Sequence, residues 1–140
     1  MPLITVSYTT SRQSPLLKAE IAGAVSELTA KILHKDPEVT AIIVKSVDAA
    51  DWFAGGKSLA EQKLASYWID VHVTEGTNTK DEKAAYLAAM FARMGDILGP
   101  LHQETYLHVD EVRGDAYGFG GVSQERRYIA GKLAVSLQAA

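Results

Sequence analysis

The stretch "DWFAGG" at residues 51–56 returns later in the chain as "AYGFGG" at residues 116–121, and this echo decides the fold. The two Gly-Gly pairs lie 65 positions apart, and the same offset places aromatic Trp52 on aromatic Tyr117. Other positions matched at this offset are Ile4 and Ile69, Val6 and Val71, Thr9 and Thr74, Lys18 and Lys83, and Val44 and Val109. A register that stays constant without a gap indicates a duplicated structural unit.

The first copy has the pattern of a strand, a helix and a second strand. Alternating apolar residues over 4–8 predict the first strand. Ser14 and Pro15 predict a helix start, with the serine hydroxyl as the N-cap and proline at the first helical position. An apolar stripe with helical spacing follows and ends at the Asp-Pro pair of residues 36–37. The short β-branched run at 39–44 predicts the second strand.

The second copy repeats this order of elements. Apolar residues alternate over 69–73, which predicts the third strand. Thr79 is placed to cap a second helix, and the Gly-Pro pair at 99–100 is placed to end it. Residues 105–109 then predict the fourth strand.

These elements predict an α+β fold in a single domain over residues 1–140. Strand, helix and parallel strand join by a right-handed crossover, so we expect a four-stranded mixed sheet with two helices on one face. We place the first repeat at about 2–57, the second at about 67–122, and a C-terminal tail at 123–140. Each Gly-Gly pair allows positive φ and predicts a short hairpin that reaches toward a neighbour.

The second face of this sheet is predicted to be polar. Thr5, Ser7, Asp70 and His72 all belong to it, so either contact with other copies or a water-filled channel must accompany it. Asp70 and His72 could ligate a metal ion, but two ligands do not complete a site. We therefore expect no metal and no cofactor.

Composition narrows the classes of partner. The chain has no cysteine, which excludes disulfides and thiolate metal sites. Its net charge is −3 and it has no basic run, so we expect no nucleic-acid partner. It has no apolar run of about 18 residues, so we expect no membrane partner. The N-terminus does not resemble a signal peptide, and we predict a cytoplasmic location.

Pro2 is the candidate catalytic residue. Initiator methionine is usually removed before a small residue, and removal would leave the secondary amine of Pro2 at the start of the chain. An α-amine has an ordinary pKa of about 7.7–8.0, which an apolar pocket lowers. Such an amine is a general base suited to removing a proton beside a carbonyl. The alternative is structural, because strands tolerate proline at their first residue.

With Pro2, Arg12 and the two aromatic Gly-Gly turns, the chain resembles the tautomerase superfamily in its fused two-repeat form, similar to the cis-3-chloroacrylic acid dehalogenases. The resemblance implies a homotrimer and a small carboxylic acid substrate. It also implies that Tyr117 and Trp52 correspond to the family's pocket aromatic. A tautomerase acting on a 2-oxo or enol acid is the function we predict.

The chain departs from the fused relatives in its cations. Their carboxylate-binding arginines correspond to Thr74 and Thr77, which cannot form an ion pair, although each hydroxyl can donate a hydrogen bond. Arg12 is the first-repeat counterpart of Thr77, and we expect it nearer a mirror pocket beside Tyr67. The dehalogenase histidine and glutamate that activate water correspond to Thr29 and Ala116, which makes hydrolytic dehalogenation doubtful.

Other residues could bind the substrate instead. Arg113, Arg126 and Arg127 are candidate carboxylate anchors, and solvated or interface arginines are the alternative. His108 could polarise a carbonyl, or it could be a structural histidine. Two alternative functions stay open: a hydratase, decarboxylase or dehalogenase with a protonated proline, and a non-catalytic trimeric binding protein.

Overall fold

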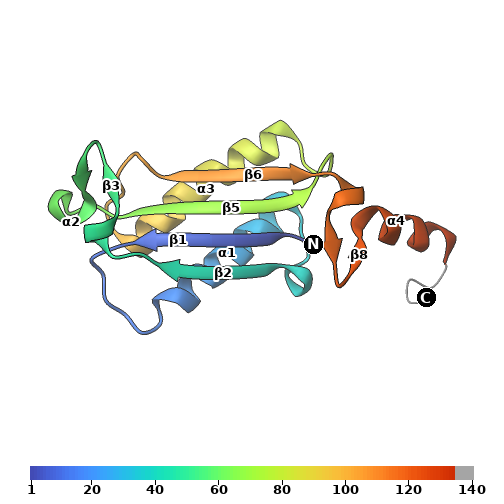
Figure 1. Ribbon diagram of the computed structural model, residues 1–140, viewed down its shortest axis with the longest axis horizontal. Coiled ribbons are helices and arrows are strands. Elements are labelled where there is room, and N and C mark those ends of the chain that lie inside the picture. The colour runs from blue at the N-terminus through green and yellow to red at the C-terminus, as the bar shows by residue number, and fades with distance from the viewer. Residues whose placement is uncertain (135–140) are drawn as a thin grey trace.

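The computed structural model describes residues 1–134 and forms one four-stranded sheet backed by helices (Figure 1). The strand order is β2-β1-β5-β6. β1 (Leu3–Thr9) is parallel to β2 (Ala41–Ser46), and β5 (Ser66–Thr74) is parallel to β6 (Tyr106–Val112). The two halves meet where β1 runs antiparallel to β5, so the mixed sheet of the sequence prediction is confirmed.

The register of the central pair has the symmetry of a duplication. Leu3 pairs with His72, and Ser7 pairs with Trp68. The repeat offset of 65 carries the first pair onto the second with the strands exchanged. The two β-α-β units are therefore related by an approximate two-fold axis through the β1–β5 pairing.

Two long helices cover one face of the sheet (Figure 1). α1 (Leu17–Leu33) and α3 (Lys80–Leu98) bury one side each against the strands and contact one another. The side chains that point from the two central strands into this layer are fully buried: Ile4, Val6, Ile69 and Val71. Burial of such apolar side chains is the main source of stability, at about 25 cal/mol per Å².

The start of one long helix was predicted correctly from the sequence, and the start of the other was not. Thr79 caps α3 and forms a capping box with Glu82, as predicted. The predicted start of α1 at Ser14 is wrong, because the helix begins at Leu17. The Ser14 hydroxyl instead accepts a hydrogen bond from the backbone N–H of Leu16, which holds a turn before the helix.

Both Gly-Gly pairs form the predicted hairpins. The first is β3 (Phe53–Ala54) with β4 (Lys57–Ser58), and the second is β7 (Gly118–Phe119) with β8 (Val122–Ser123). All four glycines have φ between 58° and 82°, a region that disfavours other residues. A helix follows each hairpin: α2 (Leu59–Gln62) and α4 (Gln124–Leu133).

Short 3-10 turns complete the chain path: η1 (Pro37–Val39), η2 (Ala49–Asp51) and η3 (Gly114–Ala116). The η1 turn occupies the start of the predicted second strand, so β2 begins two residues later than expected. α4 extends from the end of the sheet where the chain begins (Figure 1). It fills much of the predicted C-terminal tail, and residues 135–140 of that tail lie outside the described part.

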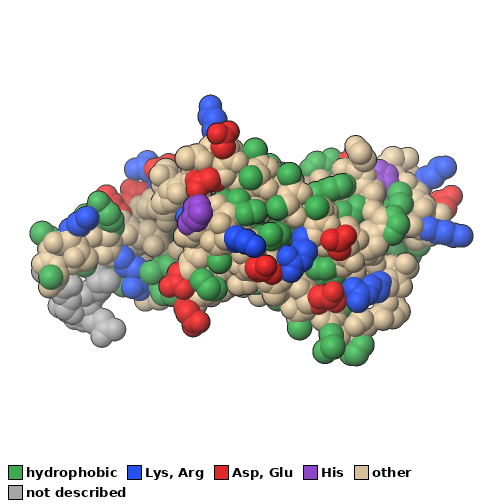
Figure 2. Space-filling view, turned by 180° about the vertical axis from the view of Figure 1, so that it is seen from behind, with side chains coloured by type: hydrophobic (Ala, Val, Ile, Leu, Met, Phe, Trp, Pro, Cys, Tyr) green, Lys and Arg blue, Asp and Glu red, His purple; other side chains and the backbone are tan. Residues whose placement is uncertain are grey.

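The sheet face opposite α1 and α3 has no covering layer in the described chain. Apolar Leu3, Ile43 and Tyr106 are 40–50% exposed there. On the helix side, positive and negative side chains are interspersed rather than gathered (Figure 2). Among the described residues, no helix has the length and apolar character needed to cross a membrane.

We predict that Tyr86 makes the fold sensitive to alkali. Its hydroxyl lies 2.7 Å from the hydroxyl of Thr29, which itself donates to the Val25 carbonyl. Burial raises the pKa of Tyr86 to about 12. The folded pKa exceeds the unfolded pKa, so stability is complete below pH of about 10 and falls by up to about 3 kcal/mol toward pH of about 12.

Urea unfolding of wild type and Tyr86→Phe at about pH 8 and at about pH 11 tests this prediction. At the lower pH the variant should lose about 1 kcal/mol, the value of one buried hydrogen bond. Between the two pH values it should lose less stability than wild type. Tyr128→Phe is the matched control, because Tyr128 is 68% exposed. An alkaline loss of equal size in Tyr86→Phe would contradict the prediction.

Candidate active site

A cavity of about 340 Å³ opens at the start of β1, and Pro2 forms part of its wall. Pro2 is buried, and its carbonyl accepts a hydrogen bond from the Ala41 N–H at 3.0 Å, which ties the start of β1 to β2. The second hairpin closes the cavity from the other side. Apolar lining residues predominate: Pro2, Leu3, Val39, Ala41 and Phe119. Glu38 is the only acidic residue among those that line it.

Tyr117 is brought directly to Pro2 by the turn before β7. Its hydroxyl donates to the carbonyl of Met1 at 2.6 Å and to the carbonyl of His72 at 3.2 Å. The Met1 carbonyl carbon is bonded to the Pro2 nitrogen, so the phenol lies beside that nitrogen. Burial raises the pKa of Tyr117, which keeps it a hydrogen-bond donor at neutral pH.

Lys35 supplies positive charge at this end of the sheet, and sequence reasoning missed it. Burial, and then the charge of Lys35, lower the pKa of the terminal amine on Met1. Burial also lowers the pKa of Lys35 itself. The lysine ammonium donates to the Thr77 hydroxyl at 2.8 Å, and that hydroxyl donates to the Thr74 carbonyl at 2.6 Å. The cations that the sequence pattern indicated were all arginines, although Lys35 directly precedes the Asp-Pro pair that ends the first helix pattern.

Arg12 lies at the opposite end of the sheet from Pro2. β1 separates them, and its seven residues at about 3.3 Å each span roughly 20 Å or more. Within one chain Arg12 therefore does not reach the Pro2 cavity. Trp52 is likewise at that far end, before β3, and it does not line this cavity.

The other sequence candidates lie outside the Pro2 cavity. Arg113 follows β6, is exposed, and pairs with Asp115 at 3.1 Å. With Thr74 it lines a neighbouring cavity of about 360 Å³. His108 stands on the uncovered sheet face with its ring edge-on to Trp68, at 4.5 Å between centroids. Arg126 belongs to α4, and the structure places it outside the residues that line these cavities.

Arg127 holds the second hairpin rather than facing the cavity. Its guanidinium donates to the Phe119 carbonyl at 2.8 Å and lies 5.0 Å from the centre of the Phe119 ring. Since Phe119 lines the Pro2 cavity, Arg127 acts on the cavity through the hairpin.

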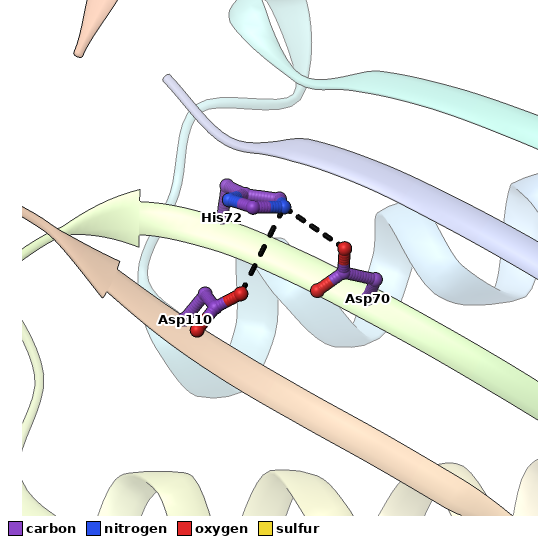
Figure 3. Close-up of side chains that lie close together, drawn as sticks. All are labelled: Asp70, His72 and Asp110. Carbon is purple, nitrogen blue, oxygen red and sulfur yellow. Dashed lines mark hydrogen bonds and ion pairs between the residues drawn. The ribbon is translucent and has the colours of Figure 1, made fainter.

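A possible metal-ligand group lies on the uncovered sheet face (Figure 3). Nε2 of His72 is 2.9 Å from a carboxylate oxygen of Asp70 and 4.0 Å from one of Asp110. The sequence indicated only Asp70 and His72, and the pairing of β5 with β6 adds Asp110 opposite His72. One nitrogen and two carboxylate ligands suit several divalent metals, but they leave a tetrahedral site incomplete.

Comparison with known proteins agrees with this arrangement. The family model described as "Tautomerase enzyme" matches residues 2–62. The "Probable tautomerase K2" of Dickeya dadantii (strain 3937) is 27% identical over 63 residues, which are 45% of this chain and 94% of that protein. Residues 2–62, which span the first repeat, are thus similar to the tautomerase family.

Solved structures extend the likeness across both repeats. A fused 4-OT described as a symmetric trimer has a TM-score of 0.75 at 19% identity, covering 88% of this chain and 96% of that one. The protein Pt0534, inactivated by 2-oxo-3-pentynoate, has a TM-score of 0.77 at 16% identity, covering 89% and 98%. The chain therefore has the fold of the fused 4-OT structure, with the two repeated units that its duplicated sequence predicted.

We predict that Arg127→Met loosens the hairpin that closes the Pro2 cavity, because the change removes both contacts of Arg127 with Phe119. Amide hydrogen exchange over residues 117–123 should become roughly tenfold faster, which corresponds to about 1.4 kcal/mol. Arg126→Met removes the same charge from the adjacent position and is the matched control. Unchanged exchange in Arg127→Met, or an equal change in the control, would show that Arg127 does not hold the hairpin.

Proposed function

We propose that this chain is a tautomerase in which Pro2, freed from Met1, shuttles a proton on a small 2-oxo or enol carboxylic acid. The observation that carries the proposal is the position of the Pro2 nitrogen, buried at a mostly apolar cavity with the Tyr117 hydroxyl beside it. Pro2 would take a proton from the carbon next to the carbonyl and return it to another carbon of the resulting enol.

The surroundings of Pro2 favour a neutral amine. Burial and the charge of Lys35 already lower the pKa of the terminal amine one residue earlier. Both influences act in the same direction on an amine at Pro2, because each disfavours the protonated form. A base with a pKa near the working pH is the most effective proton shuttle.

Tyr117 and Lys35 would bind different groups of the substrate. The Tyr117 hydroxyl is a donor placed to stabilise negative charge on the enol oxygen as it develops. Lys35 would attract the carboxylate, replacing the arginines that the fused relatives were expected to carry. Glu38 would repel a carboxylate at its own side of the cavity, which favours binding toward Lys35.

We also propose a homotrimer. The uncovered sheet face and the hairpins at its ends leave surfaces that one copy does not fill. The fused 4-OT relative is described as a trimer, which supports the same assembly here. A cytoplasmic location remains a prediction from the sequence.

Pro2→Ala is the direct test of the base. With phenylenolpyruvate as the substrate and ketonisation followed by absorbance, we expect kcat/KM to fall at least about 100-fold, the usual range for a general base. Pro15→Ala, outside the cavity, is the matched control. Mass spectrometry of the purified protein should find Met1 removed. Retained Met1, or equal rates in Pro2→Ala and wild type, would refute the proposal and favour a non-catalytic binding protein.

Lys35→Met tests the electrostatic part of the proposal. In wild type, kcat/KM should rise with pH through a pKa below the ordinary 7.7–8.0 of an α-amine. Removing the positive charge should move that pKa upward and raise KM several-fold, whereas Lys35→Arg should preserve both. Lys31→Met, in the last turn of α1, controls for net charge.

The direction in which the rate changes with pH distinguishes a neutral Pro2 that acts as a base from a protonated Pro2 that acts as an acid. An unmoved pKa in Lys35→Met would refute the role of the lysine. A rate that falls as pH rises would show a protonated Pro2, as a hydratase or decarboxylase requires.

A further inference from the structure

We propose that Asp70, His72 and Asp110 bind one divalent transition-metal ion of the zinc type on the uncovered face of the sheet (Figure 3). Each of the three side chains offers one ligand atom, and these atoms all lie within 4.8 Å of one another. None of the three residues lines the Pro2 cavity, so the site is separate from the proposed catalytic groups. The proposal therefore does not depend on the proposed function.

Strand pairing places the three ligands on one face of the sheet. Asp70 and His72 are two positions apart on β5, and alternate residues of a strand point to the same side. Asp110 of β6 is the partner of His72 in the parallel pairing, so its side chain lies beside the imidazole. β5 is hydrogen-bonded to a strand on each side, which fixes the backbone of its two ligands. Ligands held by a rigid sheet lose little conformational freedom when an ion binds.

The spacing of the ligand atoms suits a metal ion. Nε2 of His72 lies 2.9 Å from a carboxylate oxygen of Asp70 and 4.0 Å from one of Asp110. Zinc bonds of about 2.0–2.2 Å to nitrogen and oxygen keep two ligand atoms roughly 3–3.5 Å apart. The two distances lie on either side of that range. The Asp110 side chain is 59% exposed, so a small rotation can bring its carboxylate to bonding distance.

The charge of the group also favours a cation. Among the described residues, neither carboxylate has a Lys or Arg partner, and both pair only with His72. Lys45 is the only Lys or Arg in the four strands, and it lies on β2, which β1 separates from β5. With a neutral imidazole as the third ligand, one divalent ion balances the two carboxylate charges.

The first repeat provides an internal comparison. At the positions equivalent to the three ligands, 65 residues earlier, it has Thr5, Ser7 and Lys45. Neutral hydroxyls are not usual zinc ligands, and a lysine ammonium has no lone pair to offer. The same sheet face thus forms in the first repeat with none of the three ligand groups, so the fold does not require them. Their convergence in the second repeat is an independent indication of a binding role.

The ligand set narrows the kind of ion. Ca²⁺ and Mg²⁺ prefer oxygen ligands alone, whereas an imidazole nitrogen favours Zn²⁺, Co²⁺ or Ni²⁺. The side chains of His72 and Asp70 are 33% and 28% exposed, so the remaining coordination position is open to water. Three protein ligands and a water make up an open zinc site. His108, on the same face, packs edge-on against Trp68 and does not belong to the group.

Calorimetric titration of metal-free protein with Zn²⁺ tests the proposal. We expect one ion to bind per chain, and the ring-nitrogen NMR signals of His72 should shift and saturate with it. His72→Gln should weaken binding at least about 100-fold, and Asp70→Asn and Asp110→Asn each at least about tenfold. Mg²⁺ at the same concentration should not displace Zn²⁺. Because Asp110 is largely exposed, Asp110→Asn tests the site even where His72→Gln does not fold.

Glu111→Gln is the matched control, because Glu111 adjoins Asp110 on β6 but pairs with Lys83 of α3 on the opposite face of the sheet. This variant and Pro2→Ala should both bind Zn²⁺ as wild type does. Unchanged binding in the ligand variants, an equal loss in Glu111→Gln or Pro2→Ala, displacement by Mg²⁺, or no saturable binding would refute the site. One ion per three chains would show that copies share the ion, which would refute a site complete in one chain.

Discussion

The antiparallel pairing of β1 with β5 is the constraint on which the rest of this structure depends. It joins two β-α-β units into one sheet and buries the inward side chains of both central strands under α1 and α3. Because the pairing is antiparallel, each unit directs the hairpin after its second strand toward the other unit's first strand. This is why Tyr117 of the second repeat lies beside Pro2 of the first.

The same pairing gives the molecule two related ends with different chemistry. One end combines a buried proline, a tyrosine hydroxyl and Lys35 around a mostly apolar cavity. The other combines Arg12 with hydroxyl side chains around a polar cavity. The two repeats therefore place different side chains at the two ends of one shared framework. Apolar walls lower an amine's pKa, whereas polar walls do not.

The uncovered sheet face is connected to the Pro2 cavity through β5. It combines exposed apolar side chains with the Asp70, His72 and Asp110 group. The carbonyl of His72 also accepts a hydrogen bond from Tyr117, so the strand that carries this group contacts the Pro2 cavity through its backbone. Packing of copies on this face would therefore fix the position of β5 relative to Tyr117.

The sequence by itself determined the elements, their order and the duplication, because apolar periodicity and Gly-Gly turns are local signals. It also indicated Pro2, from its position after the initiator methionine, and Tyr117, which the repeat offset matches to Trp52. It misplaced the start of α1, where Pro15 and Leu16 form a turn that the Ser-Pro pattern does not distinguish from a helical first turn.

Only the tertiary structure decided which charges lie together. Lys35 approaches the terminal amine and Asp110 joins His72, because the fold brings together residues that are far apart in sequence. Electrostatic effects depend on distance and burial in space, and neither is encoded in the local pattern of residues.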